Sequence, residues 1–277
     1  MPSNDLQKRS RSYLLAVEDT EFLLRDEMRS IRFALEHGKA EMLLRDWGVR
    51  STVIVFGSAR IPSPEAAEHL LSAADGPQAL EVAKKRTGLV RWYEEARRFA
   101  RIVSERGGAK ITDHHLRDNV IATGGGPGIM EAANRGASEA GAPSIGFNIT
   151  LPAEQDPNAY STPELTFRFH YFAMRKMHLA MRANALVVFP GGFGTLDELF
   201  EILTLRQTGK APPIPVVLID QAYWRAAIGF ETLVTEGFVA RADLDLFAFA
   251  ETAVEAWDAL LAGGLEPGRP LGAKPAV

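Results

Sequence analysis

Two glycine-rich turns contain the residues best suited to bind a phosphate group. The turns are Gly124-Gly125-Gly126-Pro127-Gly128 and Pro190-Gly191-Gly192-Phe193-Gly194-Thr195, and each follows an apolar run and precedes a pattern of helical period. The first amides of a helix have no partner inside the helix and carry partial positive charge, and glycine lets an anion approach the backbone closely. The sequence therefore predicts a nucleotide site formed by two helix N-termini.

The common nucleotide motifs are missing from both turns. Neither turn reads G-x-G-x-x-G, and G-x-x-x-x-G-K-[ST] occurs nowhere in the chain, which disfavours a standard dinucleotide site or P-loop. Ser58 and Arg60 follow the apolar run 52–56, where the carboxyl end of a parallel strand gathers ligands. Both residues are therefore candidates to contact the nucleotide, although an ordinary turn with a surface arginine is nearly as good an interpretation.

Composition narrows the class of protein. The chain has 277 residues, 46% of them hydrophobic, with a formal charge of −4, so it can form one large core and has no general field to attract nucleic acid. It contains no cysteine, which excludes disulfides and thiolate ligands, and His114-His115 has no partners at metal-ligand spacing. The polar start lacks an apolar segment of signal or membrane-spanning length. We expect a cytoplasmic protein with no membrane or nucleic-acid partner and no metal site.

Alternating apolar runs and helical patterns predict the fold. We expect strands at residues 52–56, 119–123, 144–149, 165–171, 185–189, 215–219 and 246–250, and helices at 92–105, 129–140, 173–182, 195–208, 223–236 and up to about residue 261. Such alternation implies right-handed crossovers. The fold class is therefore α/β, with a mostly parallel sheet covered on both faces in three layers.

Three segments lie outside this regular pattern. Residues 1–50 form a helical extension in which Asp19 or Thr20 can cap a helix and Gly38 can stop one. Residues 62–89 form an insertion of one or two small helices within the domain at 51–262. Residues 263–277 are rich in glycine and proline, and we expect a flexible tail.

The four residues 195–198 allow two interpretations of the role of Glu198. Thr195-Leu196-Asp197-Glu198 matches a capping box, in which threonine and glutamate satisfy each other's backbone amides. Alternatively, Glu198 is a functional carboxylate in the first turn of a helix, beside a bound anion. Glu131, three residues after Gly128, allows the same choice between a cap and a contact to the base or ribose.

Three motifs in order resemble a known family. Residues 190–198 match the signature P-G-G-x-G-T-x-x-E at every fixed position, Arg175-Lys176 matches the Arg-Lys pair of its M-x-x-R-K helix, and the glycines of 124–128 with Met130 match its earlier loop. The chain thereby resembles the LOG-like nucleoside 5′-monophosphate phosphoribohydrolases, often labelled lysine decarboxylase-like. The resemblance covers roughly residues 52–219. Gly126-Pro127-Gly128-Ile129-Met130-Glu131 is more similar to the larger, AMP-nucleosidase-like members.

The resemblance implies a Rossmann-like doubly wound domain, usually dimeric, that hydrolyses the N-glycosidic bond of a purine nucleoside 5′-monophosphate such as AMP or N6-modified AMP. No cofactor is needed. By position, Glu198 and Arg175 are the catalytic pair; Glu198 stabilises an oxocarbenium-like ribose or activates water, and Arg175 pairs with phosphate or keeps Glu198 ionised. The 5′-phosphate is expected on the amides of Gly192, Gly194 and Thr195. The nucleotide-binding set comprises Gly125, Gly126, Gly128, Gly191, Gly192, Gly194, Thr195, Ser58, Arg60, Glu131 and Lys176.

Two other functions fit parts of the sequence. A non-catalytic nucleotide carrier or sensor could use the same scaffold, because fold does not determine function. Retention of both Glu198 and Arg175 argues against it. A pyridoxal phosphate decarboxylase would need Lys176 to form a Schiff base and a partner for the pyridine nitrogen, and the sequence specifies neither.

Overall fold

A single parallel sheet organises the chain. The computed structural model describes residues 2–110, 115–151 and 156–268. In these ranges seven strands, all parallel to their neighbours, lie in the order β4-β3-β2-β1-β5-β6-β7. The strands are β1 (Thr52–Phe56), β2 (Val120–Thr123), β3 (Ser144–Ile149), β4 (Thr166–Phe169), β5 (Ala183–Val188), β6 (Val216–Ile219) and β7 (Ala248–Ala250). The predicted strands and their parallel arrangement are confirmed.

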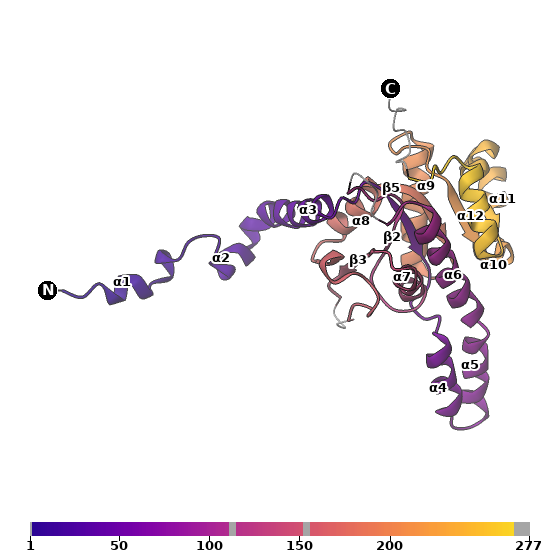
Figure 1. Ribbon diagram of the computed structural model, residues 1–277, viewed down its shortest axis with the longest axis horizontal. Coiled ribbons are helices and arrows are strands. Elements are labelled where there is room, and N and C mark those ends of the chain that lie inside the picture. The colour runs from indigo at the N-terminus through magenta and orange to yellow at the C-terminus, as the bar shows by residue number, and fades with distance from the viewer. Residues whose placement is uncertain (1, 111–114, 152–155, 269–277) are drawn as a thin grey trace.

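Helices cover both faces of the sheet, as predicted for a three-layer α/β fold (Figure 1). One face carries α3 (Arg29–Asp46), α8 (Phe172–Met181), α9 (Phe193–Gln207), α10 (Gln221–Ala227) and α11 (Phe230–Thr235). The other carries α6 (Val90–Arg106), α7 (Ile129–Glu139) and α12 (Ala253–Ala262). The structure also contains short 3-10 helices, which are η1 (Arg11–Tyr13), η2 (Asp26–Met28), η3 (Pro163–Leu165) and η4 (Arg241–Leu246).

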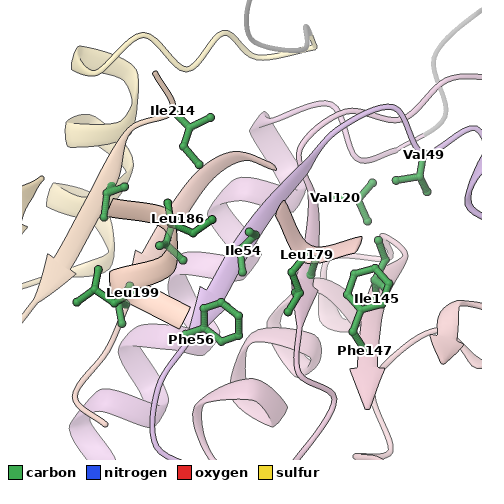
Figure 2. Close-up of a cluster of buried hydrophobic side chains, with 14 of the residues drawn as sticks. Val49, Ile54, Phe56, Val120, Ile145, Phe147, Leu179, Leu186, Leu199 and Ile214 are labelled. Atoms are coloured by element: carbon green, nitrogen blue, oxygen red, sulfur yellow. The ribbon is translucent and has the colours of Figure 1, made fainter. Parts of the chain in front are cut away.

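The strand residues alternate between two hydrophobic cores. In β1, Val53 and Val55 belong to the core beneath α6, α7 and α12, while Ile54 and Phe56 belong to the core on the opposite face. Figure 2 shows this second core, where Ile54 and Phe56 lie among side chains from neighbouring strands and from helices such as α9. Because both faces are buried, the strand sequences are almost continuously apolar.

The N-terminal extension is helical, but its helices differ from those expected. The short helices α1 (Asp5–Arg9) and α2 (Thr20–Leu24) bury no residue and extend away from the sheet (Figure 1), and Asp19 caps α2 as predicted. Gly38 was expected to stop a helix, and this is wrong: Gly38 lies inside α3. An interior glycine costs a helix only about 1 kcal/mol, and the packing of α3 outweighs this. The chain turns instead at Gly48, with φ at 67°.

In three other segments the structure adds detail to the prediction or differs from it. The insertion forms two helices, α4 (Pro64–Ser72) and α5 (Pro77–Thr87), and the helix predicted at 223–236 is divided into α10 and α11 around Gly229. The first part of the predicted tail is packed rather than flexible, since Leu265 is buried and the Gly268 amide donates to the carbonyl of Gly107 at 2.8 Å. Residues 269–277 lie outside the described residues. None of the described helices has the length and apolar character needed to cross a bilayer.

Candidate active site

The two glycine turns lie at the carboxyl edge of the sheet, where the strand order reverses. Strand β1 lies between β2, which leads into the first glycine turn, and β5, which leads into the second. The backbone of Ser58, just after β1, joins the two turns: its N–H donates to the carbonyl of Pro190 at 3.0 Å, and its carbonyl accepts from the amide of Ile129 at 3.2 Å. Crevices at such switch points are the usual ligand sites of open α/β sheets.

The first glycine turn is held tightly by the protein. Gly128 has φ at 72°, and a Cβ there would lie 2.8 Å from the Cα of Ala59, so only glycine fits without strain. The amide of Gly125 donates to the hydroxyl of Thr123 at 3.0 Å. Since that amide already has an acceptor, Gly125 contributes to the turn's shape more directly than to phosphate binding.

Two asparagines that were not predicted secure the same turn. The side-chain amide of Asn158 donates to the carbonyls of Gly125 and Gly126 at 3.0 and 3.1 Å. It also donates to the side-chain oxygen of Asn134, a fully buried residue of α7. A polar residue among the alanines of this helix was a signal for Asn134. Asn158 carried none, because its partners lie 32 and 33 residues away.

The second glycine turn has open space beside two of its glycines. A Cβ on Gly191 would lie 2.6 Å from the Cβ of Thr195, whereas one on Gly192 or Gly194 would meet nothing within 4 Å. Helix α9 begins at Phe193, and the Thr195 amide donates to the carbonyl of Gly192 at 3.0 Å. The expected use of the Thr195 amide for phosphate is therefore corrected.

Two other amides of this turn are better placed to bind an anion. Within the described residues, the N–H groups of Phe193 and Gly194 have no acceptor. They are the first amides of a 15-residue helix, where the helix dipole favours an anion. The hydroxyl of Tyr223, on α10, donates to the carbonyl of Gly191 at 2.5 Å and so stabilises the turn. Nothing in the sequence indicated this role for Tyr223.

Glu198 and Arg175 form a buried ion pair beside this turn. Arg175 Nη2 lies 2.8 Å from Glu198 Oε1, and the two side chains are 14% and 5% exposed. The capping-box interpretation is wrong, because α9 begins two residues before Thr195 and Gly192 holds the N-cap position. Glu198 consequently lies in the second turn of the helix rather than the first, and its carboxylate is free to face α8.

Burial and charge act in opposite directions on Glu198. Burial raises the pKa of its carboxyl above the ordinary value, and nearby Glu201 adds to the rise, while the cations of Arg175 and Lys176 oppose it. A carboxyl with a raised pKa beside a cation is typical of a catalytic acid or base.

Arg175 keeps donors available for a second anion. Its guanidinium stacks over the ring of Phe172 at 5.0 Å, and its buried Nε has no hydrogen-bond partner among the described residues. An arginine that uses only part of its donor set on a carboxylate can still bind a phosphate. The pair can therefore couple the carboxylate to a phosphorylated ligand.

Lys176 faces carboxylates instead of the glycine turns. Its Nζ lies 2.8 Å from Asp197 Oδ2 and 3.0 Å from Glu201 Oε2. Burial lowers the pKa of Lys176, but these two carboxylates outweigh burial and the net shift is upward. A Schiff-base lysine needs the opposite, a lowered pKa. This arrangement argues against the decarboxylase hypothesis, and direct phosphate binding by Lys176 stays a prediction.

The remaining candidates have other partners. Glu131 accepts from the hydroxyl of Tyr93 at 2.8 Å and joins α7 to α6, with no capping bond to its own helix. The Ser58 hydroxyl accepts from the amide of Arg60 at 3.1 Å. Contact of these three residues with a nucleotide remains a prediction. Across the described ranges, no group of three or more His, Asp or Glu side chains is placed to hold a metal ion, and His114 lies outside them.

Comparison with known proteins places the chain among related sequences. A family model described as "Possible lysine decarboxylase" matches residues 130–260. A probable cytokinin riboside 5′-monophosphate phosphoribohydrolase from Oryza sativa subsp. japonica is 27% identical over 151 residues, covering 53% of this chain and 64% of that protein. A cytokinin riboside 5′-monophosphate phosphoribohydrolase from Arabidopsis thaliana is 27% identical, covering 50% and 64%. The chain thus spans slightly less than two thirds of these relatives.

Among solved structures, a molybdenum cofactor binding protein from Rippkaea orientalis aligns with a TM-score of 0.47 at 18% identity, covering 77% of this chain and 97% of that one. A Moco carrier protein from Chlamydomonas reinhardtii aligns with a TM-score of 0.45 at 19% identity, covering 77% and 98%.

Proposed function

We propose that this chain, a member of the LOG-like family, hydrolyses the N-glycosidic bond of a nucleoside 5′-monophosphate and releases the free base and ribose 5-phosphate. The observation that carries the proposal is the buried pair of Glu198 and Arg175, 2.8 Å apart, beside the N-terminus of α9. Relatives from two plants are named as phosphoribohydrolases of cytokinin riboside 5′-monophosphates, which supports the same reaction class.

In this mechanism the second glycine turn holds the 5′-phosphate. The amides of Phe193 and Gly194, at the positive end of α9, donate to phosphate oxygens, and the hydroxyl of Thr195 adds a donor. The guanidinium of Arg175, which uses Nη2 on Glu198, supplies a further charged donor to the phosphate. Binding through the phosphate orients the ribose against the carboxylate.

Glu198 acts on the ribose. As the glycosidic bond breaks, positive charge develops on the ribose ring, and the ionised carboxylate stabilises it and accepts a proton from the attacking water. Arg175 favours the ionised form of Glu198 against the effect of burial. The departing base takes its proton from solvent or from the site, and no cofactor enters the reaction.

The proposed substrate is a purine monophosphate, AMP or N6-modified AMP, and the proposed assembly is a homodimer. The purine preference is supported by the sequence of the first glycine turn, residues 126–131. The homodimer is supported by an apolar surface on α9, where Phe193 is 92% and Phe200 39% exposed next to Leu196. A second copy covering this surface would bury it next to the Glu198–Arg175 pair.

The first experiment is chromatography of purified protein incubated with AMP, adenosine and CMP. We expect adenine from AMP and none from adenosine, because the phosphate supplies the binding energy that orients the ribose. Glu198→Gln should lower the rate by about 10²–10⁴-fold, the usual contribution of a positioned acid or base.

Glu164→Gln is the matched control. Glu164 is an exposed glutamate on η3 without a described hydrogen bond, so its amide variant should keep the wild-type rate. Absence of any free base despite measurable AMP binding would contradict the proposed reaction and favour a carrier or sensor. Equal rates with AMP and adenosine would contradict the phosphate-binding role of α9.

A further inference from the structure

Helix α3 of the N-terminal extension contacts α8, the helix that carries Arg175, from the start of α8 to its end. At the start of α8, Arg32 Nε donates to the hydroxyl of Tyr171 at 2.9 Å. In the middle, the rings of His37 and His178 stack at 5.2 Å. At the end, Arg182 Nη2 lies 2.7 Å from Glu41 Oε1. The placement of α8 on the sheet therefore depends on α3.

The start of α8 is also held by a carboxylate of α3. Glu36 of α3 accepts from the amide of His170 at 2.8 Å and from the amide of Tyr171 at 3.3 Å. Tyr171 holds the N-cap position of α8, and its own side chain makes no capping hydrogen bond. A carboxylate from 134 residues earlier in the chain thus accepts from the N-cap amide, one of the four amides at a helix start that have no partner inside the helix, and lies at the positive end of the helix dipole.

This contact lies one turn before Arg175. The amide of Arg175 donates to the carbonyl of Tyr171 at 3.3 Å, which closes the first turn of α8. If the start of α8 frays or rotates, Arg175 moves with it, and its 2.8 Å contact with Glu198 is lost or lengthened. Because a displacement of about 1 Å in an active site can cost up to 10²-fold in rate, a remote contact can control catalysis.

We propose that Glu36 is a positioning residue for the reaction: by holding the start of α8 from the N-terminal extension, it keeps Arg175 against Glu198. This inference rests on the proposed function of that pair. It also gives the extension a role in the active site, since residues outside the region of family resemblance hold one of the two catalytic side chains in place.

The test compares Glu36→Ala and Glu36→Gln with the wild-type protein. For Glu36→Ala we expect kcat for AMP to fall about 10-fold or more, and the acid limb of the pH–rate profile to move to higher pH, because Glu198 loses its nearby cation. Glu36→Gln keeps an oxygen that can accept from the two amides, so it should lie between Glu36→Ala and the wild type. Glu27→Ala is the control, since exposed Glu27 pairs with neighbouring Arg25 and with no other side chain in the described part of the chain.

A second readout does not depend on activity. The side-chain carboxyl carbon of Glu198 can be followed by NMR in protein labelled with ¹³C-glutamate and assigned by its absence in Glu198→Gln. We expect its titration midpoint to rise in Glu36→Ala and to stay unchanged in Glu27→Ala. Glu36→Ala leaves the core residues of α3 intact, and circular dichroism checks that the Glu36→Ala protein is folded.

The outcomes separate the two proposals. If the wild type hydrolyses AMP but Glu36→Ala keeps its kcat, pH profile and Glu198 midpoint, the positioning role is refuted and the proposed function stands. If the wild type releases no base but the Glu198 midpoint rises in Glu36→Ala, the proposed function fails while the coupling of α3 to the pair stands. A fall in kcat without movement of the pH profile or the midpoint would indicate a purely structural effect and overturn the inference.

Discussion

His178 offers a sharp test of how burial determines stability in this protein. Its ring is 1% exposed, and neither ring nitrogen has a hydrogen-bond partner among the described residues. It packs against His37 and against Phe147, at 6.2 Å between ring centroids. Burial lowers the pKa of His178 to about 4, with smaller contributions from His37 and Arg182, while Glu41 acts in the opposite direction. The folded protein therefore keeps this imidazole neutral at mildly acidic pH.

The size of the effect follows from the two pKa values. In the unfolded chain His178 titrates near its ordinary value of about 6.5, so as the pH falls the unfolded state binds the proton first. The stability associated with neutral His178 is fully present above about pH 6.5 and is lost as the pH falls toward the folded value of about 4. Between pH 7 and pH 5 this loss amounts to about 2 kcal/mol.

The assay is urea unfolding at pH 7 and pH 5 of the wild type, His178→Leu and the control His69→Leu. His69 is exposed on α4, so its replacement leaves the buried site unchanged. We expect the wild type and the control to lose about 2 kcal/mol more than His178→Leu between the two pH values, because leucine has no proton to bind. Carboxylates titrate alike in all three proteins and cancel in the comparison. Equal pH dependence in the wild type and His178→Leu would refute the reasoning.

Two further predictions concern the active site. In Arg175→Gln the cation that opposes burial is removed, so the pKa of Glu198 should rise further; a pH–rate profile should show its acid limb at higher pH, and an unmoved limb would contradict the coupling. Gly191→Ala should lower the free energy of unfolding by about 1–3 kcal/mol, because its methyl group would lie 2.6 Å from the Cβ of Thr195. Gly194→Ala, inside the first turn of α9, adds a methyl group that meets nothing within 4 Å and should not lower stability in the same urea titration, so similar losses in both variants would argue against the clash.

The strands and most helices were predictable because their signal is local. The run Thr52–Phe56 is apolar after Thr52 and β-branched up to Phe56, which favours a buried strand, and its bounds were predicted correctly. Gly38 shows where local reasoning fails. A glycine is a reasonable helix stop in isolation, but the burial of Ala40 and Leu44 against the sheet keeps α3 helical through it.

The candidate site was predictable only in part. The glycine turns and the pair of Glu198 with Arg175 were identified from motif and spacing, and the structure brings that pair within 2.8 Å. The supports of the site were not predictable. Tyr223 contacts Gly191 across 32 residues, and Glu36 contacts His170 across 134, and no spacing rule connects residues so far apart.

The alternation of strands and helices, and with it a parallel sheet whose glycine turns meet at one edge, follows from the sequence, because hydrophobic period and glycine conformation are properties of short segments. The arrangement of charge at that edge follows from the packing of the whole chain. In the folded protein, Glu198 is a buried partner of Arg175 rather than a helix cap, and Lys176 pairs with Asp197 and Glu201. The physical reason is that burial and charge pairing depend on which elements pack together, and packing is settled by the whole chain.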